Sequence, residues 1–121
     1  MLVDDDADIR LALRRYLERD GSAFRVVAEA SDGEEALALA AAAQPDVVIL
    51  DLTMPGSGGL DVLPSLRETL SESRIVVFSG VAHELTPGRA HELGADEVVG
   101  KTDGLSALGA ALGGHGGTTQ R

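Results

Sequence analysis

Short apolar runs alternate along the chain with segments in which apolar residues recur every three or four positions. Each apolar run predicts a strand: 1–3, 24–30, 47–50, 75–78 and 97–100. The helical spacing predicts five helices, marked by Ile9, Leu13, Tyr16 and Leu17, by 33–43, by Leu60, Leu63, Leu66 and Leu70, by 86–94, and by Leu105, Leu108 and Leu112. Strands that alternate with helices in this way predict an α/β fold with a parallel sheet covered on both faces.

The helix boundaries have their own signals. Asp32 is placed to cap the start of the alanine-rich helix, and Pro45 follows its end. Thr86 and Pro87 form a pair typical of a helix start, and Gly94 is typical of a helix end. These signals fix the order of elements along the chain.

Length and composition indicate one domain. The chain has 121 residues, of which 44% are hydrophobic, enough to fill one core. We expect this domain over residues 1–112, followed by a flexible glycine-rich tail over 113–121. We expect no internal repeat and no second domain in this sequence.

Charge and composition also exclude several classes of function. A net charge of −10 opposes direct binding to nucleic acid and to anionic lipid. The absence of cysteine excludes disulfides and thiolate chemistry. Neither a leader pattern nor an apolar run long enough to cross a membrane occurs, so we expect a cytoplasmic protein without a membrane partner.

Polar residues follow several of the predicted strands. Asp4 and Asp5 end the first strand, Asp51 ends the third, Ser79 ends the fourth, and Lys101 follows the fifth. In an open parallel sheet, ligands bind outside the carboxyl ends of the strands, where the strand order reverses. We therefore expect these five side chains at one edge of the sheet.

The charges at this edge indicate what it binds. Two carboxylates about 4 Å apart repel by on the order of 4 kcal/mol at an effective dielectric of about 20. Lys101 offsets one of the three negative charges. The remainder suits one Mg²⁺, a hard cation that prefers oxygen ligands and retains several waters. Asp51 can then act as a nucleophile toward phosphorus while Mg²⁺, Lys101 and Ser79 stabilise the transferred oxygens, and the product would be an aspartyl phosphate.

Four motifs carry a resemblance to a known family. They are Val3-Asp4-Asp5, Leu50-Asp51-Leu52-Thr53-Met54-Pro55-Gly56, Phe78-Ser79-Gly80 and Lys101. In this order and spacing, the chain resembles the receiver domain of two-component response regulators from residue 1 to about 112. The resemblance implies a flavodoxin-like doubly wound fold of five strands in the order 2-1-3-4-5.

The resemblance also implies roles for individual residues. Asp51 would accept a phosphoryl group from a sensor histidine kinase or a phosphotransfer protein. Asp5, Asp51 and the backbone carbonyl of Thr53 would bind Mg²⁺, and Asp4 would act through a water molecule. Ser79 and Lys101 would contact the phosphoryl group. Such a domain catalyses its own phosphorylation and dephosphorylation rather than turning over a substrate, and it would switch contacts with a downstream effector protein or within a weak homodimer.

Several positions depart from the family pattern. Val98 stands where many members carry an aromatic residue, and Thr102 stands where proline usually follows the lysine, so the usual cis bond is not expected. Gly104, Gly109, Gly113 and Gly114 are expected to weaken the last helix, each interior glycine by roughly 1 kcal/mol relative to alanine. Met1 falls within the first strand, where relatives usually have a few more residues.

Two alternatives remain open. A pseudo-receiver would keep the fold but signal without phosphorylation, and Val98 and Thr102 favour this interpretation. An aspartate-nucleophile phosphatase of the haloacid-dehalogenase type would need a second aspartate two residues after the nucleophile. The chain has Thr53 at that position, which argues against the phosphatase.

Overall fold

A computed structural model of the chain describes residues 1–54 and 59–113. The predicted tail beyond residue 113 and part of the expected turn after Asp51 lie outside these residues. The structure confirms a five-stranded parallel sheet in the order β2-β1-β3-β4-β5. The strands are β1 (Leu2–Val3), β2 (Glu29–Ala30), β3 (Val47–Leu50), β4 (Arg74–Ser79) and β5 (Glu97–Gly100).

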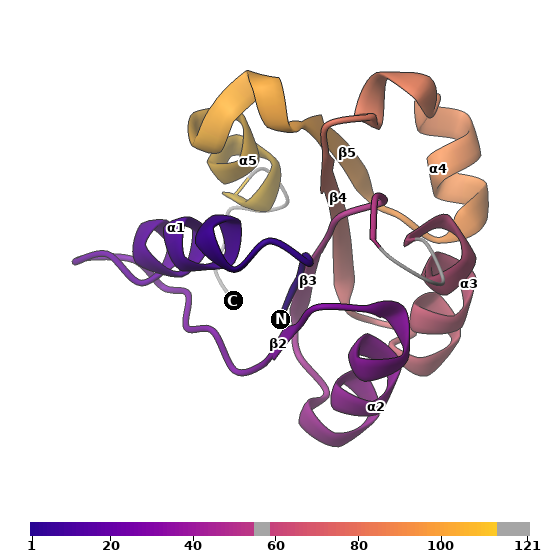
Figure 1. The fold of residues 1–121 in the computed structure, drawn as a ribbon, viewed down its shortest axis with the longest axis horizontal. Coiled ribbons are helices and arrows are strands. Elements are labelled where there is room, and N and C mark those ends of the chain that lie inside the picture. The colour runs from indigo at the N-terminus through magenta and orange to yellow at the C-terminus, as the bar shows by residue number, and fades with distance from the viewer. Residues whose placement is uncertain (55–58, 114–121) are drawn as a thin grey trace.

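Helices cover both faces of this sheet (Figure 1). One face carries α1 (Ala7–Leu17) and α5 (Gly104–Gly113), and the other carries α2 (Gly33–Ala43), α3 (Gly59–Thr69) and α4 (Pro87–Leu93). Short 3-10 turns, η1 (Ala82–Glu84) and η2 (Lys101–Asp103), follow β4 and β5. Among the described residues, none of the helices combines the length and apolar character that crossing a membrane requires.

The alternation of side chains along the strands divides the core into two layers. Strand residues that face α1 and α5 pack with leucines of those helices: Leu2, Ile49, Val76, Phe78 and Val99 with Leu13, Leu17, Leu108 and Leu112. Their sequence neighbours face α2, α3 and α4: Val3, Val48, Leu50, Ile75 and Val77. Both faces of each central strand are therefore apolar, which explains the uninterrupted apolar runs in the sequence.

The predicted helix boundaries are confirmed by their capping contacts. The Asp32 carboxylate accepts a hydrogen bond from the Glu35 amide at 2.8 Å, and the Thr86 hydroxyl accepts one from the Arg89 amide at 3.1 Å. Gly94 ends α4 with φ of 117°, a conformation that favours glycine. The starts of α2 and α4 thus end the loops that follow β2 and β4 at the edge of the sheet that carries the polar residues, whereas Gly94 lies at the opposite edge.

The prediction of a strand over 24–30 was wrong in length, because β2 contains only Glu29 and Ala30. β2 lies at the edge of the sheet and pairs with β1 alone, where Leu2 faces Glu29 and Val3 faces Ala30. β1 begins at Leu2, so residues 24–27 have no neighbouring strand backbone in the described chain. Apolar character at these positions therefore does not produce a strand, and the side chain of Val27 remains 52% exposed.

The glycine at position 109 has a packing role that the sequence did not reveal. A Cβ atom at Gly109 would meet the hydroxyl oxygen of Tyr16 on α1. α5 forms over its whole predicted length, with Leu108 and Leu112 buried. Gly109 therefore allows α1 and α5 to approach each other, so its low helix propensity is offset by this packing.

Candidate functional site

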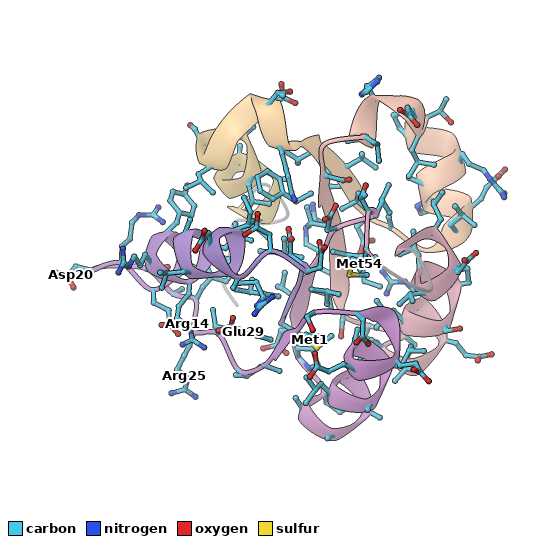
Figure 2. The ribbon with its side chains drawn as sticks, in the orientation of Figure 1. Met1, Arg14, Asp20, Arg25, Glu29 and Met54 are labelled. Carbon is cyan, nitrogen blue, oxygen red and sulfur yellow. The ribbon has the colours of Figure 1, made fainter. Side chains whose placement is uncertain are left out.

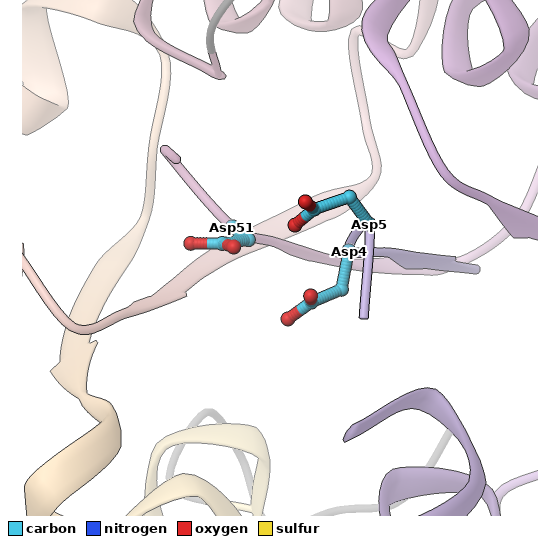
Figure 3. A group of neighbouring side chains, drawn as sticks. All are labelled: Asp4, Asp5 and Asp51. Carbon is cyan, nitrogen blue, oxygen red and sulfur yellow. The ribbon is translucent and has the colours of Figure 1, made fainter. Parts of the chain in front are cut away.

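Three carboxylates gather at the carboxyl ends of β1 and β3 (Figure 3). Asp4 and Asp5 follow β1, Asp51 follows β3, and their carboxylate oxygens lie within 4.8 Å of one another. Asp4 and Asp51 are buried, whereas Asp5 is exposed. The structure thus brings together the three acidic residues that the sequence analysis selected.

Strand pairing produces this cluster. Val3 pairs with Leu50, and the Asp51 amide donates to the Val3 carbonyl at 2.9 Å. On the other side of β1, the Asp4 amide donates to the Ala30 carbonyl at 3.0 Å. Because Val3 and Leu50 are fully buried in the core, a change of register would expose apolar side chains. Core packing therefore fixes the register of β1 and β3, and this register places the carboxylates of Asp4, Asp5 and Asp51 side by side.

Lys101 lies between two of these carboxylates. Its Nζ atom is 2.8 Å from Asp4 Oδ2 and 3.3 Å from Asp51 Oδ2. Burial alone would lower the pKa of Lys101, but hydrogen bonds and attraction to Asp4 and Asp51 outweigh burial and raise the pKa above its usual value. The lysine therefore stays protonated and links β5 to the acidic cluster.

The backbone after Asp51 also contributes to the site. The Thr53 amide donates to Asp51 Oδ1 at 3.1 Å, so each Asp51 oxygen has a partner. Gly59 begins α3 directly against this backbone, and a Cβ atom there would lie 2.6 Å from Leu52 Cα and would also meet the Asp51 carbonyl oxygen. Gly59 is thus needed for the close approach of α3 to the strand that presents Asp51.

Ser79 lies on the neighbouring strand. It ends β4, is fully buried, and pairs in register with Gly100, the residue before Lys101. Its hydroxyl accepts a hydrogen bond from the Val81 amide at 3.4 Å. Direct contacts join Asp4, Asp51 and Lys101, while Ser79 belongs to the same edge through the strand register.

The sequence analysis did not select Arg10 or Gly59. Arg10 lies on the first turn of α1, and its NH1 group donates to the Asp4 carbonyl at 2.6 Å. Its position six residues after Asp4, about one turn into the helix, could have indicated that its side chain reaches back to the end of β1. Gly59 could have been noticed as a glycine at a helix start. A glycine at such a position lets the helix approach a neighbouring backbone closely.

The arrangement is suited to a cation. Three carboxylates and one lysine leave a net charge of −2, and carboxylates at about 4.8 Å repel by roughly 3 kcal/mol per pair at an effective dielectric of about 20. A divalent cation would offset this charge, and a purely oxygen-based set of ligands favours Mg²⁺ or Ca²⁺ over softer metals. The exposed Asp5 leaves one side of the cluster accessible from solvent.

A family model described as the response regulator receiver domain matches residues 1–112. The chain belongs to this family of two-component signalling domains. The resemblance drawn from the sequence motifs is thus confirmed. The receiver fold accounts for the observed strand order and for the acidic edge of the sheet.

A named relative agrees with this assignment. The nitrate/nitrite response regulator protein NarL of Escherichia coli K12 is 41% identical over 96 residues, which are 79% of this chain and 44% of that protein. The chain therefore spans less than half the length of this relative.

Two solved structures are also similar. The response regulator TrrA from Thermotoga maritima, in complex with Mg²⁺-BeF, has a TM-score of 0.78 and 31% identity and covers 92% of each chain. A response regulator from Burkholderia pseudomallei with a phosphorylated aspartic acid and a calcium ion has a TM-score of 0.76 and 32% identity, covering 92% of this receiver and 64% of that chain.

Proposed function

We propose that this receiver domain accepts a phosphoryl group on Asp51 in a Mg²⁺-dependent reaction, from the phosphohistidine of a sensor histidine kinase or of a phosphotransfer protein. The observation that carries the proposal is that Asp51 belongs both to the acidic cluster and to the Lys101 ion pair. Two receivers similar in structure contain Mg²⁺-BeF and a phosphorylated aspartic acid, respectively, and they support the same chemistry.

The reaction is a displacement at phosphorus. An Asp51 carboxylate oxygen attacks the phosphorus, an O–P bond forms, and the bond to the donor histidine nitrogen breaks. Lys101 stabilises negative charge on the transferred oxygens, and the Ser79 hydroxyl can donate a hydrogen bond to them. Asp5, Asp51 and the Thr53 carbonyl would hold Mg²⁺ directly, with Asp4 acting through water. When bound, the metal neutralises charge on the phosphoryl oxygens.

Phosphorylation would then change contacts with a downstream effector protein or within a weak homodimer. We place this signalling in the cytoplasm, and a net charge of −10 argues against direct binding of this chain to nucleic acid. The activity belongs to the domain itself and is not a turnover enzyme activity. Since the chain spans 44% of NarL, that protein's overall function is not carried over.

The site gives no support to a pseudo-receiver that signals without phosphorylation. That alternative rested on Val98 and Thr102, yet both lie outside the acidic cluster. Val98 is half-buried against the core shared with α2, α3 and α4. The carboxylates and Lys101 that phosphorylation requires lie together, so the departures at 98 and 102 bear on how the signal spreads rather than on the chemistry.

Intact-mass analysis after incubation with acetyl phosphate and Mg²⁺ tests the proposal. We expect one added phosphoryl group that hydroxylamine removes, and none in Asp51→Asn. Asp6→Asn is the matched control, because Asp6 caps α1 and an asparagine can replace it as a cap. Undiminished labelling of Asp51→Asn would place the acceptor elsewhere. A wild-type chain that neither acetyl phosphate nor any kinase labels would favour the pseudo-receiver.

A further inference from the structure

Arg10 joins the site to the edge of the sheet. From the first turn of α1, its NH1 group donates to the Asp4 carbonyl at 2.6 Å, and its Nε group donates to Glu29 Oε1 on β2 at 3.1 Å. The side chain is largely buried, with 20% of its surface exposed. One guanidinium thus binds a backbone oxygen of the site and a carboxylate on the neighbouring strand at once.

The contacts around Asp4 show which part of the site the hydrogen bond from Arg10 to the Asp4 carbonyl holds. Its amide donates to the Ala30 carbonyl, its Oδ1 accepts from the Asp6 amide at 2.9 Å, and its Oδ2 lies 2.8 Å from Lys101. The carbonyl bonded to Arg10 belongs to the peptide group that links Asp4 to Asp5. The orientation of this peptide group determines where Asp5 projects.

The side chain of Asp5 is exposed, and within residues 1–54 and 59–113 it accepts no hydrogen bond from another residue. We propose that Arg10 is a positioning residue, which holds the Asp4–Asp5 peptide group so that the Asp5 carboxylate is in place for a divalent cation before the cation binds. This inference rests on the Mg²⁺ site of the proposed function. Charge-assisted hydrogen bonds to an oriented guanidinium are strong and directional, which suits this task.

Glu29 anchors the guanidinium. It also accepts hydrogen bonds from Arg14 Nε at 2.9 Å and from Arg14 NH2 at 2.7 Å, and Arg14 and Glu29 lie side by side in Figure 2. The hydrogen bond from Arg14 lowers the pKa of Glu29 and keeps it ionised as the partner of Arg10. Because the Glu29 carboxylate compensates the positive charge of Arg10, we expect Arg10 to repel a bound Mg²⁺ only weakly.

Calorimetric titration with Mg²⁺ separates positioning from charge. We expect the Kd for Mg²⁺ to rise about tenfold in both Arg10→Gln and Arg10→Lys, at the low end of the effect of removing partners of metal ligands. Lysine keeps the charge but cannot bind the Asp4 carbonyl and Glu29 through one planar group. Tighter binding in Arg10→Gln with no change in Arg10→Lys would show that only charge matters, and would overturn the proposal.

Arg14→Gln is the matched control, since Arg14 contacts the same Glu29 from the same helix and, among the described residues, forms no hydrogen bond with Asp4. We expect its Kd to stay within about twofold of the wild type. An equal loss in Arg14→Gln would mean that general loosening of α1 explains the effect, and this too would overturn the proposal.

A second measurement does not depend on metal binding. The NMR order parameter of the Asp5 amide in the metal-free protein should fall in Arg10→Gln and remain unchanged in Arg14→Gln. If the wild type bound no Mg²⁺ but Asp5 still lost order in Arg10→Gln, the proposed metal site would fail while the positioning role stood. An unchanged Asp5 order parameter would refute the positioning role whatever the metal data show.

Discussion

The two ends of the sheet differ in how far their charged side chains are compensated by neighbouring groups. At the carboxyl ends of the strands, three carboxylates face one lysine. At the amino ends, the guanidinium of Arg67 on α3 donates hydrogen bonds from all three of its nitrogens. Its partners are the carbonyls of Leu70, Ser71, Ser73 and Gly94 and the carboxylate of Asp96.

The difference shows where stability and function are located. Arg67 ties the end of α3 to the segment between α4 and β5, and Asp96 also accepts from the Ile75 amide at 2.8 Å. The charges of Arg67 and Asp96 compensate each other there, so this ion pair contributes to stability. The opposite end leaves a net charge of −2, which a folded protein tolerates when a ligand is to compensate it.

The largest effect on stability should come from Arg67→Met. It removes the charged partner of the Asp96 carboxylate and the guanidinium donor of four carbonyls, and we expect the free energy of unfolding to fall by about 3 kcal/mol. Urea unfolding followed by circular dichroism would measure this. Arg89→Met is the control, because Arg89 pairs only with Glu92 in the described chain at an exposed site. A change in Mg²⁺ affinity in Arg67→Met would show that the two ends of the sheet are coupled. It would contradict the assignment of stability to one end and ligand binding to the other.

An intermediate effect should follow from adding Mg²⁺. Binding to the folded state alone stabilises by RT ln(1 + [Mg²⁺]/Kd), about 1.4 kcal/mol at ten times Kd. The melting temperature should therefore rise with Mg²⁺ in the wild type and in Asp6→Asn, but not in Asp5→Ala. Asp5→Ala should also melt higher than the wild type without metal, because one repelling carboxylate is gone. If Mg²⁺ does not change the melting temperature and titration shows no binding of Mg²⁺ or Ca²⁺, the proposed metal site is refuted.

The smallest effect concerns high pH. The pKa of Lys101 is raised in the folded protein, so its contribution to stability is present below its unfolded pKa, about 10.4, and is lost as pH rises through the folded value. The guanidinium of Arg67 remains protonated throughout this range. Unfolding free energies across pH 10 to 12 should therefore fall less steeply in Lys101→Met than in the wild type. Equal slopes would mean that the ion pairs of Lys101 contribute nothing measurable.

The sequence predicted the parallel sheet and the acidic edge because both follow from strong local rules, whereas the strand order came from the family resemblance. Apolar runs identify buried strands, and the carboxyl ends of parallel strands meet at one edge. The family motifs then selected Asp4, Asp5, Asp51 and Lys101, which the structure brings together. The assigned roles of these residues, and of Thr53 and Ser79, stay predictions until the experiments above are done.

The remaining features depend on partners that no local pattern encodes. The length of β2 depends on how much of β1 lies beside it, and residues 24–27 have the same apolar character as a strand without the pairing. Arg10 belongs to a polar position of an amphipathic helix, and only the folded chain shows that it reaches the Asp4 carbonyl. Gly109 likewise lowers helix propensity in isolation and is explained by Tyr16.

The contact between Tyr16 and Gly109 gives the domain a built-in optical probe. The chain contains one tyrosine and no tryptophan, so its tyrosine emission originates at a single point on the boundary between α1 and α5. The guanidinium of Arg19 lies 4.0 Å from the centre of the ring, which makes the emission sensitive to how α1 ends. Label-free fluorescence can therefore report whether chemistry at the acidic edge alters the packing of these two helices.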